Sequence, residues 1–148
     1  MDPVTIANEA TLIYDNITKN SNAVVTRILS LYDLTATKEA LLDSYTPGQT
    51  ITYITRVENT GSASLYNLTI VDDLANGTLQ YIDTSIEGYL NGSPIEIDVQ
   101  KTANTVTFKI DNVLNPNDNV LIIFETTTPT TNPEQITNTQ TITANGGS

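Results

Sequence analysis

Residues 51–61, ITYITRVENTG, alternate between two sets of side chains along the chain. One set can face a core and the other solvent: Ile51, Tyr53, Thr55 and Val57 against Thr52, Ile54, Arg56 and Glu58. A period of two belongs to a β-strand, because successive side chains on a strand point to opposite faces of the sheet. The same alternation recurs from one end of the chain to the other, and helical periodicity is scarce. The chain is therefore predicted to be all-β.

Turn-forming pairs separate the strand-like runs. Pro47-Gly48, Asn76-Gly77 and Asn91-Gly92 supply the backbone angles that tight turns need. We expect strands at 4–14, 51–61, 65–74, 79–85, 87–90, 93–99, 105–110, 119–128 and 134–144, and one long strand or two consecutive strands at 23–37. The segment 38–45 is the one stretch that could form a helical turn. Many short strands separated by turns are typical of an antiparallel β-sandwich of the Ig type. The apolar run 119–128 should be its central strand.

Composition excludes several classes of function. The net charge is −11, so no basic face is available for nucleic acid or for anionic lipid. Histidine and cysteine are both absent, which removes the usual general base, thiolate metal sites and disulfides. Catalytic arrangements that need Ser with His, or Cys with His, are impossible here. We therefore expect a protein that is not an enzyme and carries no cofactor.

No run of about 18 apolar residues is present, so no transmembrane helix and no membrane insertion are expected. The start of the chain is not basic and then apolar, and so predicts no signal peptide. The oxygen-rich segment 111–119 offers a candidate Ca²⁺ site, with Asp111 and Asp118 as ligands. Its spacing does not match an EF-hand loop, and ordinary turns explain it better.

The segment YTPGQTITYITRVENTGSASLYNLTIVDDL (residues 45–74) resembles an Ig-like repeat of Gram-positive surface proteins, domain of unknown function eleven. That family reads Pro-Gly-Asp, a Tyr, then Asn-x-Gly, and a strand that ends Asp-x-Leu. The matching positions here are Pro47, Gly48, Tyr53, Asn59, Gly61, Asp72 or Asp73, and Leu74. The resemblance extends over residues 31–144, with Gln49 in place of the acidic residue and NPND in place of a second Pro-Gly-Glu turn. It implies an Ig-like sandwich on a bacterial cell or spore surface.

The two ends of the chain share an Ile-x-Asn-x-x-Thr frame. It occurs as Ile6, Asn8 and Thr11 and again as Ile136, Asn138 and Thr141. In arrays of the resembled family, an element like SNAVVTRI follows the closing strand, whereas here it stands near the N-terminus, at 21–28. Residues 1–30 are therefore predicted to be an extra N-terminal β-hairpin that resembles the tail of a preceding module. Residues 31–148 are predicted to be the Ig-like module, one strand short.

A sandwich that lacks an edge strand leaves unpaired backbone groups, and two solutions are open. The N-terminal hairpin can complete the sandwich of its own chain, or it can complete the next copy by β-strand addition. The second arrangement is head-to-tail and so leads to an open fibre. The side chains expected to enter the groove of the acceptor are Ile6, Asn8, Ala10, Leu12, Val24, Val25 and Ile28.

The resemblance to surface Ig-like domains also implies a covalent bond without turnover. Such domains join a Lys on an early strand to an Asn on a late strand, with the help of a buried acid. Lys38 and Asn138 occupy those places here, with Asp72 as the acid and Asp73 or Glu58 as alternatives. By the shared frame, Asn8 could replace Asn138 and make the link intermolecular. As plain surface residues, Lys38 and Asn138 would instead be solvated.

We therefore expect a structural subunit or spacer in a bacterial cell-surface or spore-surface filament or stalk. Its partner would be a second copy of itself, or a neighbouring module of an array. The competing hypothesis is a monomeric Ig-like adhesin domain that binds a surface ligand through its loops.

Overall fold

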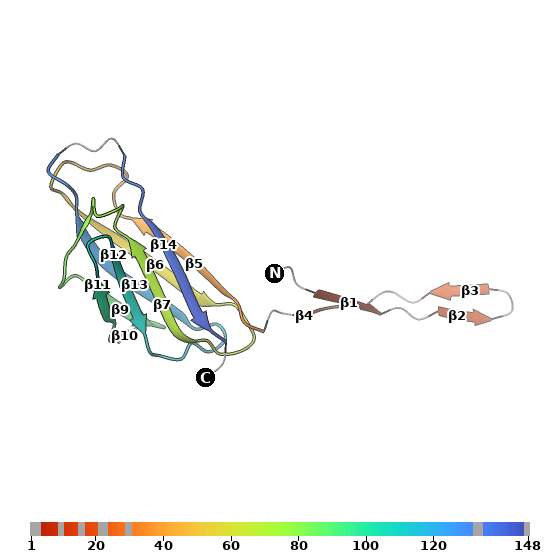
Figure 1. Ribbon diagram of the computed structural model, residues 1–148. Helices are drawn as coiled ribbons and strands as arrows, with labels where there is room; N and C mark the ends of the chain where they lie inside the picture. Colours follow the sequence, from red (N-terminus) through yellow and green to blue (C-terminus); the bar gives the residue numbers. More distant parts are fainter. Residues whose placement is uncertain are drawn as a thin grey trace. The chain divides into compact units, whose positions relative to one another are not determined.

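The computed structural model describes residues 4–8, 11–14, 17–20, 24–28, 31–131 and 135–146. The chain divides into two compact units, Met1–Leu31 and Tyr32–Ser148, and each is described by itself (Figure 1). Every regular element in the part described is a β-strand. The structure thus confirms the all-β class.

The first unit is a pair of antiparallel two-stranded sheets along one hairpin. β1 (Val4–Asn8) pairs with β4 (Val24–Ile28), and β2 (Thr11–Tyr14) pairs with β3 (Ile17–Asn20). In the register of these ladders Asn8 lies opposite Val24, and Tyr14 lies opposite Ile17. The extra N-terminal hairpin predicted from the sequence is therefore present.

The second unit is a sandwich of two antiparallel sheets that lie face to face (Figure 1). The six-stranded sheet has the order β10-β9-β13-β6-β5, with the short β8 paired to β13. Its strands are β5 (Leu34–Ala40), β6 (Thr50–Asn59), β8 (Gln80–Tyr81), β9 (Glu87–Leu90), β10 (Ser93–Ile95) and β13 (Asn119–Thr127). β13 is flanked by β6 and β9, as its apolar sequence predicts.

The four-stranded sheet has the order β11-β12-β7-β14. Its strands are β7 (Tyr66–Asp73), β11 (Asp98–Lys101), β12 (Thr105–Ile110) and β14 (Thr139–Asn145). Both the first strand of the module, β5, and its last, β14, are edge strands within the part described. An edge strand exposes a row of backbone donors and acceptors on its outer side.

The core lies between the two sheets and is built from alternate residues of the strands. Phe108 of β12 and Phe124 of β13 are fully buried, and their ring centroids are 5.0 Å apart. Tyr53 of β6 stacks on Phe124 at 5.4 Å. Branched aliphatic side chains surround these rings, among them Val57, Ile70, Val106, Ile110 and Ile122. Burial of this apolar surface is the main favourable term that holds the sheets together.

The Asn-x-Gly element of the sequence has a structural explanation. The buried Asn59 amide donates to the carbonyl oxygens of Ala63 and Leu114, at 2.9 and 2.8 Å. Its own oxygen accepts from the Gly61 N–H at 3.0 Å. One side chain thereby satisfies two backbone groups of the loop that leaves β6 and one of the segment between β12 and β13.

Four local predictions differ from the structure. The strand predicted at 134–144 begins only at Thr139, as β14. The 38–45 segment is no helical turn, because β5 runs to Ala40 and the Leu41 N–H still bonds to the Thr52 carbonyl across the ladder. The strand predicted at 79–85 is reduced to β8. The single strand predicted at 93–99 is two strands, β10 and β11, which belong to different sheets. In the residues that the structure covers, no helix has the length and apolarity to cross a membrane.

Candidate functional site

Lys38 sits on the edge strand β5, opposite Thr55 of β6. Its side chain is 16% exposed and runs inward between the sheets, although a lysine at an edge would ordinarily extend into water. Its ammonium group therefore needs partners inside the sandwich.

Two partners come from the opposite sheet. The Lys38 Nζ donates to Asp72 Oδ2 at 2.6 Å and to Asn138 Oδ1 at 2.5 Å. Asp72 lies on β7, and Asn138 immediately precedes β14. Lys38 and Asn138 are 100 residues apart in sequence. The tertiary structure thus brings together the three residues that the sequence singled out.

The pleat of β7 explains why Asp72 is the acid. Asp72 is completely buried, whereas its neighbour Asp73 faces the other side of the strand and is partly exposed. Glu58 is exposed on β6. Of the three acids considered from the sequence, Asp72 is the one that contacts Lys38.

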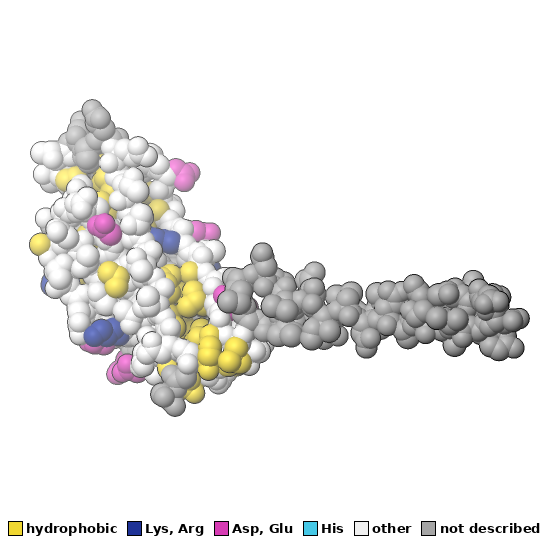
Figure 2. Space-filling model, turned by 45° about the vertical axis from the view of Figure 1, so that its right-hand side comes forward, with side chains coloured by type: hydrophobic (Ala, Val, Ile, Leu, Met, Phe, Trp, Pro, Cys, Tyr) yellow, Lys and Arg dark blue, Asp and Glu magenta, His cyan; other side chains and the backbone are white. Residues whose placement is uncertain are grey.

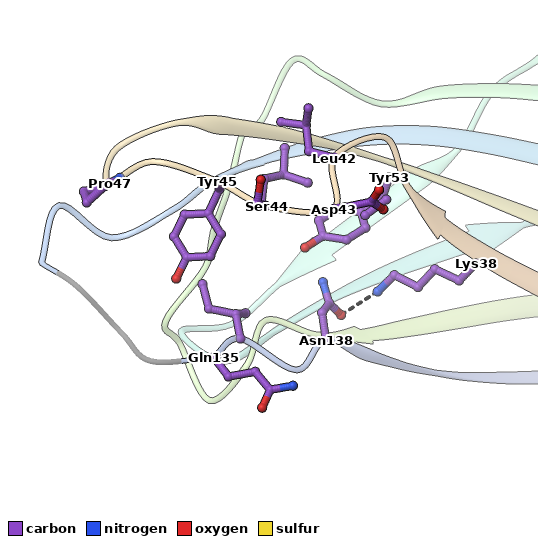
Figure 3. Close-up of a pocket in the computed structure, with 12 residues that line it drawn as sticks. Lys38, Leu42, Asp43, Ser44, Tyr45, Pro47, Tyr53, Gln135 and Asn138 are labelled. Carbon is purple, nitrogen blue, oxygen red and sulfur yellow. Dashed lines mark hydrogen bonds between the residues drawn. The ribbon is translucent and has the colours of Figure 1, made fainter.

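Aromatic rings form one wall of the site. The Lys38 Nζ lies 4.7 Å from the centroid of the Tyr53 ring and 5.9 Å from that of Phe124. A cavity of about 590 Å³ lies alongside, and Tyr45, Gln135 and Asn138 are among the residues that line it (Figure 3). The segment 41–47 and the segment 135–138 form its two sides. The site is therefore apolar on one side and open to a recess on the other.

Burial changes the acid–base properties of the pair. Desolvation lowers the pKa of Lys38, although Asp72 opposes the shift. Desolvation also raises the pKa of Asp72, against the opposing effect of Lys38. Both shifts favour the neutral forms, an amine and a carboxylic acid, because a low-polarity site disfavours charge.

This arrangement has the chemical parts of an amide transfer within the protein. A neutral Lys38 amine is a nucleophile, and the Asn138 side chain offers an amide carbonyl carbon. A protonated Asp72 can donate to the carbonyl oxygen and polarise it.

Sequence reasoning missed two residues beside this site. Gln140 follows Asn138 by two positions and so lies on the same face of its strand, and Thr55 Oγ1 donates to Gln140 Oε1 at 2.8 Å. The spacing of two was the signal that could have identified Gln140. Thr55 had no comparable signal, since its role depends on contact between the two sheets.

The remaining candidate residues fall elsewhere. Asp118 accepts bonds from Asn91 and from Asn115 within its own turn, and Asp111 is exposed. Within the described ranges, no group of three or more acidic residues could hold a metal ion. Of the predicted groove-filling residues, Ala10 lies outside the described residues. The other six lie on strands of the first unit: Ile6, Asn8, Leu12, Val24, Val25 and Ile28. The groove that they would fill stays a prediction.

No protein-family model and no curated protein matches the chain. The repeat family inferred from the sequence motifs therefore remains a resemblance.

Solved structures do match the fold. The pilus backbone protein RrgB of Streptococcus pneumoniae matches with a TM-score of 0.60 at 13% identity, over 76% of this chain and 31% of that one. BcpA, the major pilin subunit of Bacillus cereus, matches with a TM-score of 0.59 at 12% identity, over 94% of this chain and 43% of that one. The collagen-binding domain of a Staphylococcus aureus adhesin gives 0.50 at 17%, over 78% of this chain and 86% of that domain.

The chain therefore has the Ig-like sandwich fold of pilin and adhesin domains from Gram-positive bacteria. It spans less than half the length of the two pilins. At these identities the likeness establishes the fold alone, and the proteins that share it here are structural subunits and a binding domain.

Proposed function

We propose that this protein is a structural module of a filament or stalk on a bacterial cell or spore surface. The observation that carries the proposal is the contact of Lys38 with Asn138 and Asp72, inside a fold shared with pilus subunits. A covalent bond between Lys38 and Asn138 would join the two edge strands β5 and β14, at the open side of the sandwich. Such a bond would hold the two sheets together at an edge where no backbone hydrogen bonds connect them.

The bond would also determine how the module responds to a pulling force. Lys38 lies on the first strand of the module and Asn138 just before its last strand. The chain between them forms a loop closed by the new bond, so force applied at the two ends passes through the link. Strands β6 to β13 are then shielded from the load.

The bond forms in one balanced step of substitution. The neutral amine of Lys38 attacks the side-chain carbonyl carbon of Asn138, and a new C–N amide bond replaces the original one. The Lys38 nitrogen loses one proton as the new bond forms, and the Asn138 nitrogen takes up a proton and leaves as ammonia, while protonated Asp72 stabilises the carbonyl oxygen and keeps its own proton overall. No cofactor is needed. The mass of the intact chain should therefore lie about 17 Da below that of its sequence.

Intact mass spectrometry tests this bond. The wild-type chain should show the loss, and tryptic digestion should yield one branched peptide that contains Lys38 and Asn138. Lys38→Met, Asn138→Ala and Asp72→Asn should each restore the full mass, while an exposed control such as Asn112→Ala keeps the loss. A wild-type chain of unshifted mass contradicts the proposed link.

Head-to-tail assembly through residues 1–30 is the second part of the proposal. The outer edge of β14 is open in the described sheet. The Ile-x-Asn-x-x-Thr frame at 136–141 also occurs at 6–11, in the first arm of the N-terminal hairpin. In the hairpin, β4 and β3 pair with this first arm. We propose that the hairpin opens and that residues 17–28 of one copy then add to β14 of the next, so that β14 takes the place that the first arm holds in the hairpin. An open edge of matching sequence is the feature that supports this contact.

The shared frame predicts the register. Thr11 corresponds to Thr141, and Thr11 lies opposite Asn20 in the hairpin. Thr141 of one copy should therefore lie opposite Asn20 of the next. Because the chain has no cysteine, Thr141→Cys combined with Asn20→Cys gives a direct test. A ladder of disulfide-linked oligomers is expected on a non-reducing gel, and a Ser64→Cys, Asn20→Cys pair serves as the control.

Deletion of residues 2–30 distinguishes the hypothesis of a filament module from that of a monomeric adhesin-like domain. Electron microscopy of the full chain should show filaments, and size-exclusion chromatography of the deletion variant should show monomers. Filaments from the truncated chain would rule out strand donation. A full chain that stays monomeric, with the hairpin paired within one molecule, would favour the alternative of an adhesin-like domain, the function of the collagen-binding neighbour.

A further inference from the structure

Four residues form a closed circuit that crosses the sandwich twice. Lys38 lies opposite Thr55 in the β5–β6 ladder, and Thr55 Oγ1 donates to Gln140 Oε1 across the sandwich at 2.8 Å. Gln140 lies directly opposite Asp72 in the β14–β7 ladder. Asp72 returns across the sandwich to Lys38 at 2.6 Å. Asp72 therefore contacts Lys38 directly and has Gln140, held by Thr55, as its neighbour in the ladder.

The circuit contains two complementary polar atoms without partners. Asp72 Oδ1 and Gln140 Nε2 are both buried, and neither meets hydrogen-bond geometry with another group among the residues described. One is an acceptor and the other a donor, on side chains that a direct ladder pairing places about 5 Å apart at Cβ. Buried polar atoms are costly to leave unpaired, so a small side-chain rotation that joins these two is favourable. In agreement, Gln140 lowers the pKa of Asp72 against the larger effect of burial.

We propose that Gln140 is a positioning residue. Thr55 holds its side chain, and its amide N–H turns toward the free oxygen of Asp72. This contact opposes the transfer of a proton from Lys38 to Asp72. The inference rests on the proposed Lys38–Asn138 link, for which Asp72 must be protonated and Lys38 neutral. An N–H donor stabilises a carboxylate and not the acid. Gln140 thus slows formation of the bond between Lys38 and Asn138. It also shifts the pH range in which this bond forms below the range that burial alone would set.

Other charged or titratable groups around Asp72 are few. Lys38 reaches it from β5 and Tyr53 stands on β6, while Asp73 acts on Lys38 from the same strand. The residue opposite Asp72 on β12 is the apolar Val106. Two neutral amides, Gln140 and Asn138, lower the pKa of Asp72, and the effect of Gln140 is the larger. Because Asn138 is consumed by the proposed link, Gln140 is the amide that can tune the pair without taking part in the bond.

The first test reads the acid directly and does not require the link. In the full chain with Asn138→Ala, which cannot form the bond, ¹³C NMR follows the Asp72 carboxyl as pH is changed. Adding Gln140→Leu should raise the apparent pKa of Asp72 by about 0.5 to 1 unit. Thr55→Val should act in the same direction by a smaller amount, and Thr143→Val, an exposed site on β14, should change nothing. An Asp72 titration that is unmoved or moves downward in both site variants overturns the inference.

The second test follows the link itself. The full chain is recovered unfolded in urea, before Lys38 meets Asn138, and refolded at a series of pH values while intact mass is recorded over time. With Gln140→Leu, the bond should form about three to ten times faster. The fall of its rate toward low pH should begin at a higher pH than in wild type. Equal rates and profiles in wild type and variant contradict the proposed role. If wild type never loses ammonia, the link fails, and the NMR test still decides the role of Gln140.

Discussion

The side-chain oxygen of Asn138 lies 2.5 Å from the amine nitrogen of Lys38, although 100 residues of chain separate them. Lys38 belongs to the first strand of the module, and Asn138 directly precedes its last. The two strands are edges of different sheets, so no backbone ladder connects them. This contact, together with those of Lys38 with Asp72 and of Thr55 with Gln140, therefore joins the two sheets where backbone hydrogen bonds do not.

The link should contribute strongly to stability. By the chain-entropy model for cross-links, closing a loop of about 100 residues stabilises the folded state by roughly 4.7 kcal/mol. Asn138→Ala should therefore lower Tm by on the order of 20 °C in a calorimetric scan. The control Asn112→Ala removes an exposed amide and should leave Tm nearly unchanged. A small effect of Asn138→Ala, despite loss of the link, would show that the unfolded chain gains little freedom.

Asp72 predicts a specific dependence of stability on pH in the unlinked protein. Burial raises its pKa above the ordinary value of 3.8. In the window between that value and the raised pKa, the folded state binds more protons than the unfolded state, so stability falls as pH rises. Urea denaturation of Asn138→Ala, with and without Asp72→Asn, isolates this contribution. The advantage of the Asp72→Asn chain should grow with pH through the window, by up to about 1.4 kcal/mol per unit. A difference that is constant with pH would contradict the raised pKa.

Asn59 should be sensitive to substitution although it is remote from the site. Asn59→Ala removes two bonds to carbonyl oxygens and one from an N–H, all inside the protein. Leaving such groups unpaired costs about 1 to 3 kcal/mol each in the worst case, and partial access of water reduces the sum. We expect a loss of about 2 to 4 kcal/mol in the free energy of unfolding, measured by urea denaturation. Asn112→Ala is the control, because Asn112 is exposed and its backbone is not left-handed.

The hairpin turn at Asn91-Gly92 offers a test of backbone conformation alone. Asn91 and Gly92 have φ of 49° and 82°, and a Cβ on Gly92 would meet no atom within 4 Å. Gly92→Ala should therefore cost about 1 kcal/mol through strain of the left-handed backbone and not through a clash. Circular dichroism melts would show a modest fall in Tm with an unchanged spectrum. A much larger loss would mean that Gly92 has a packing role.

The distribution of charged side chains on the surface limits the kinds of partner that the protein can bind. Figure 2 shows a face on which Lys and Arg side chains are few and separated, with Asp and Glu scattered around them. Together with the net charge of −11, this surface does not suit a polyanion.

Much of the architecture followed from local sequence. Period-two alternation predicted β6, the apolar run 119–128 predicted β13, and Asn91-Gly92 predicted the hairpin between β9 and β10, because strand and turn preferences depend on neighbouring residues. The 93–99 segment shows where this reasoning ends. Its alternation is that of one strand, but β10 and β11 pair in different sheets, and no local pattern encodes that change of partner.

The site, too, was predicted only in part from the sequence. The sequence by itself determined that a lysine lies near the first strand of the module, that an asparagine lies near its last, and that acids stand between them. Only the tertiary structure decided that Asp72 and not Asp73 meets Lys38, because the pleat of β7 turns one inward and the other out. It also decided that Thr55 and Gln140 complete the circuit. Their contact crosses the gap between two sheets, and a distance across that gap depends on the packing of the whole sandwich.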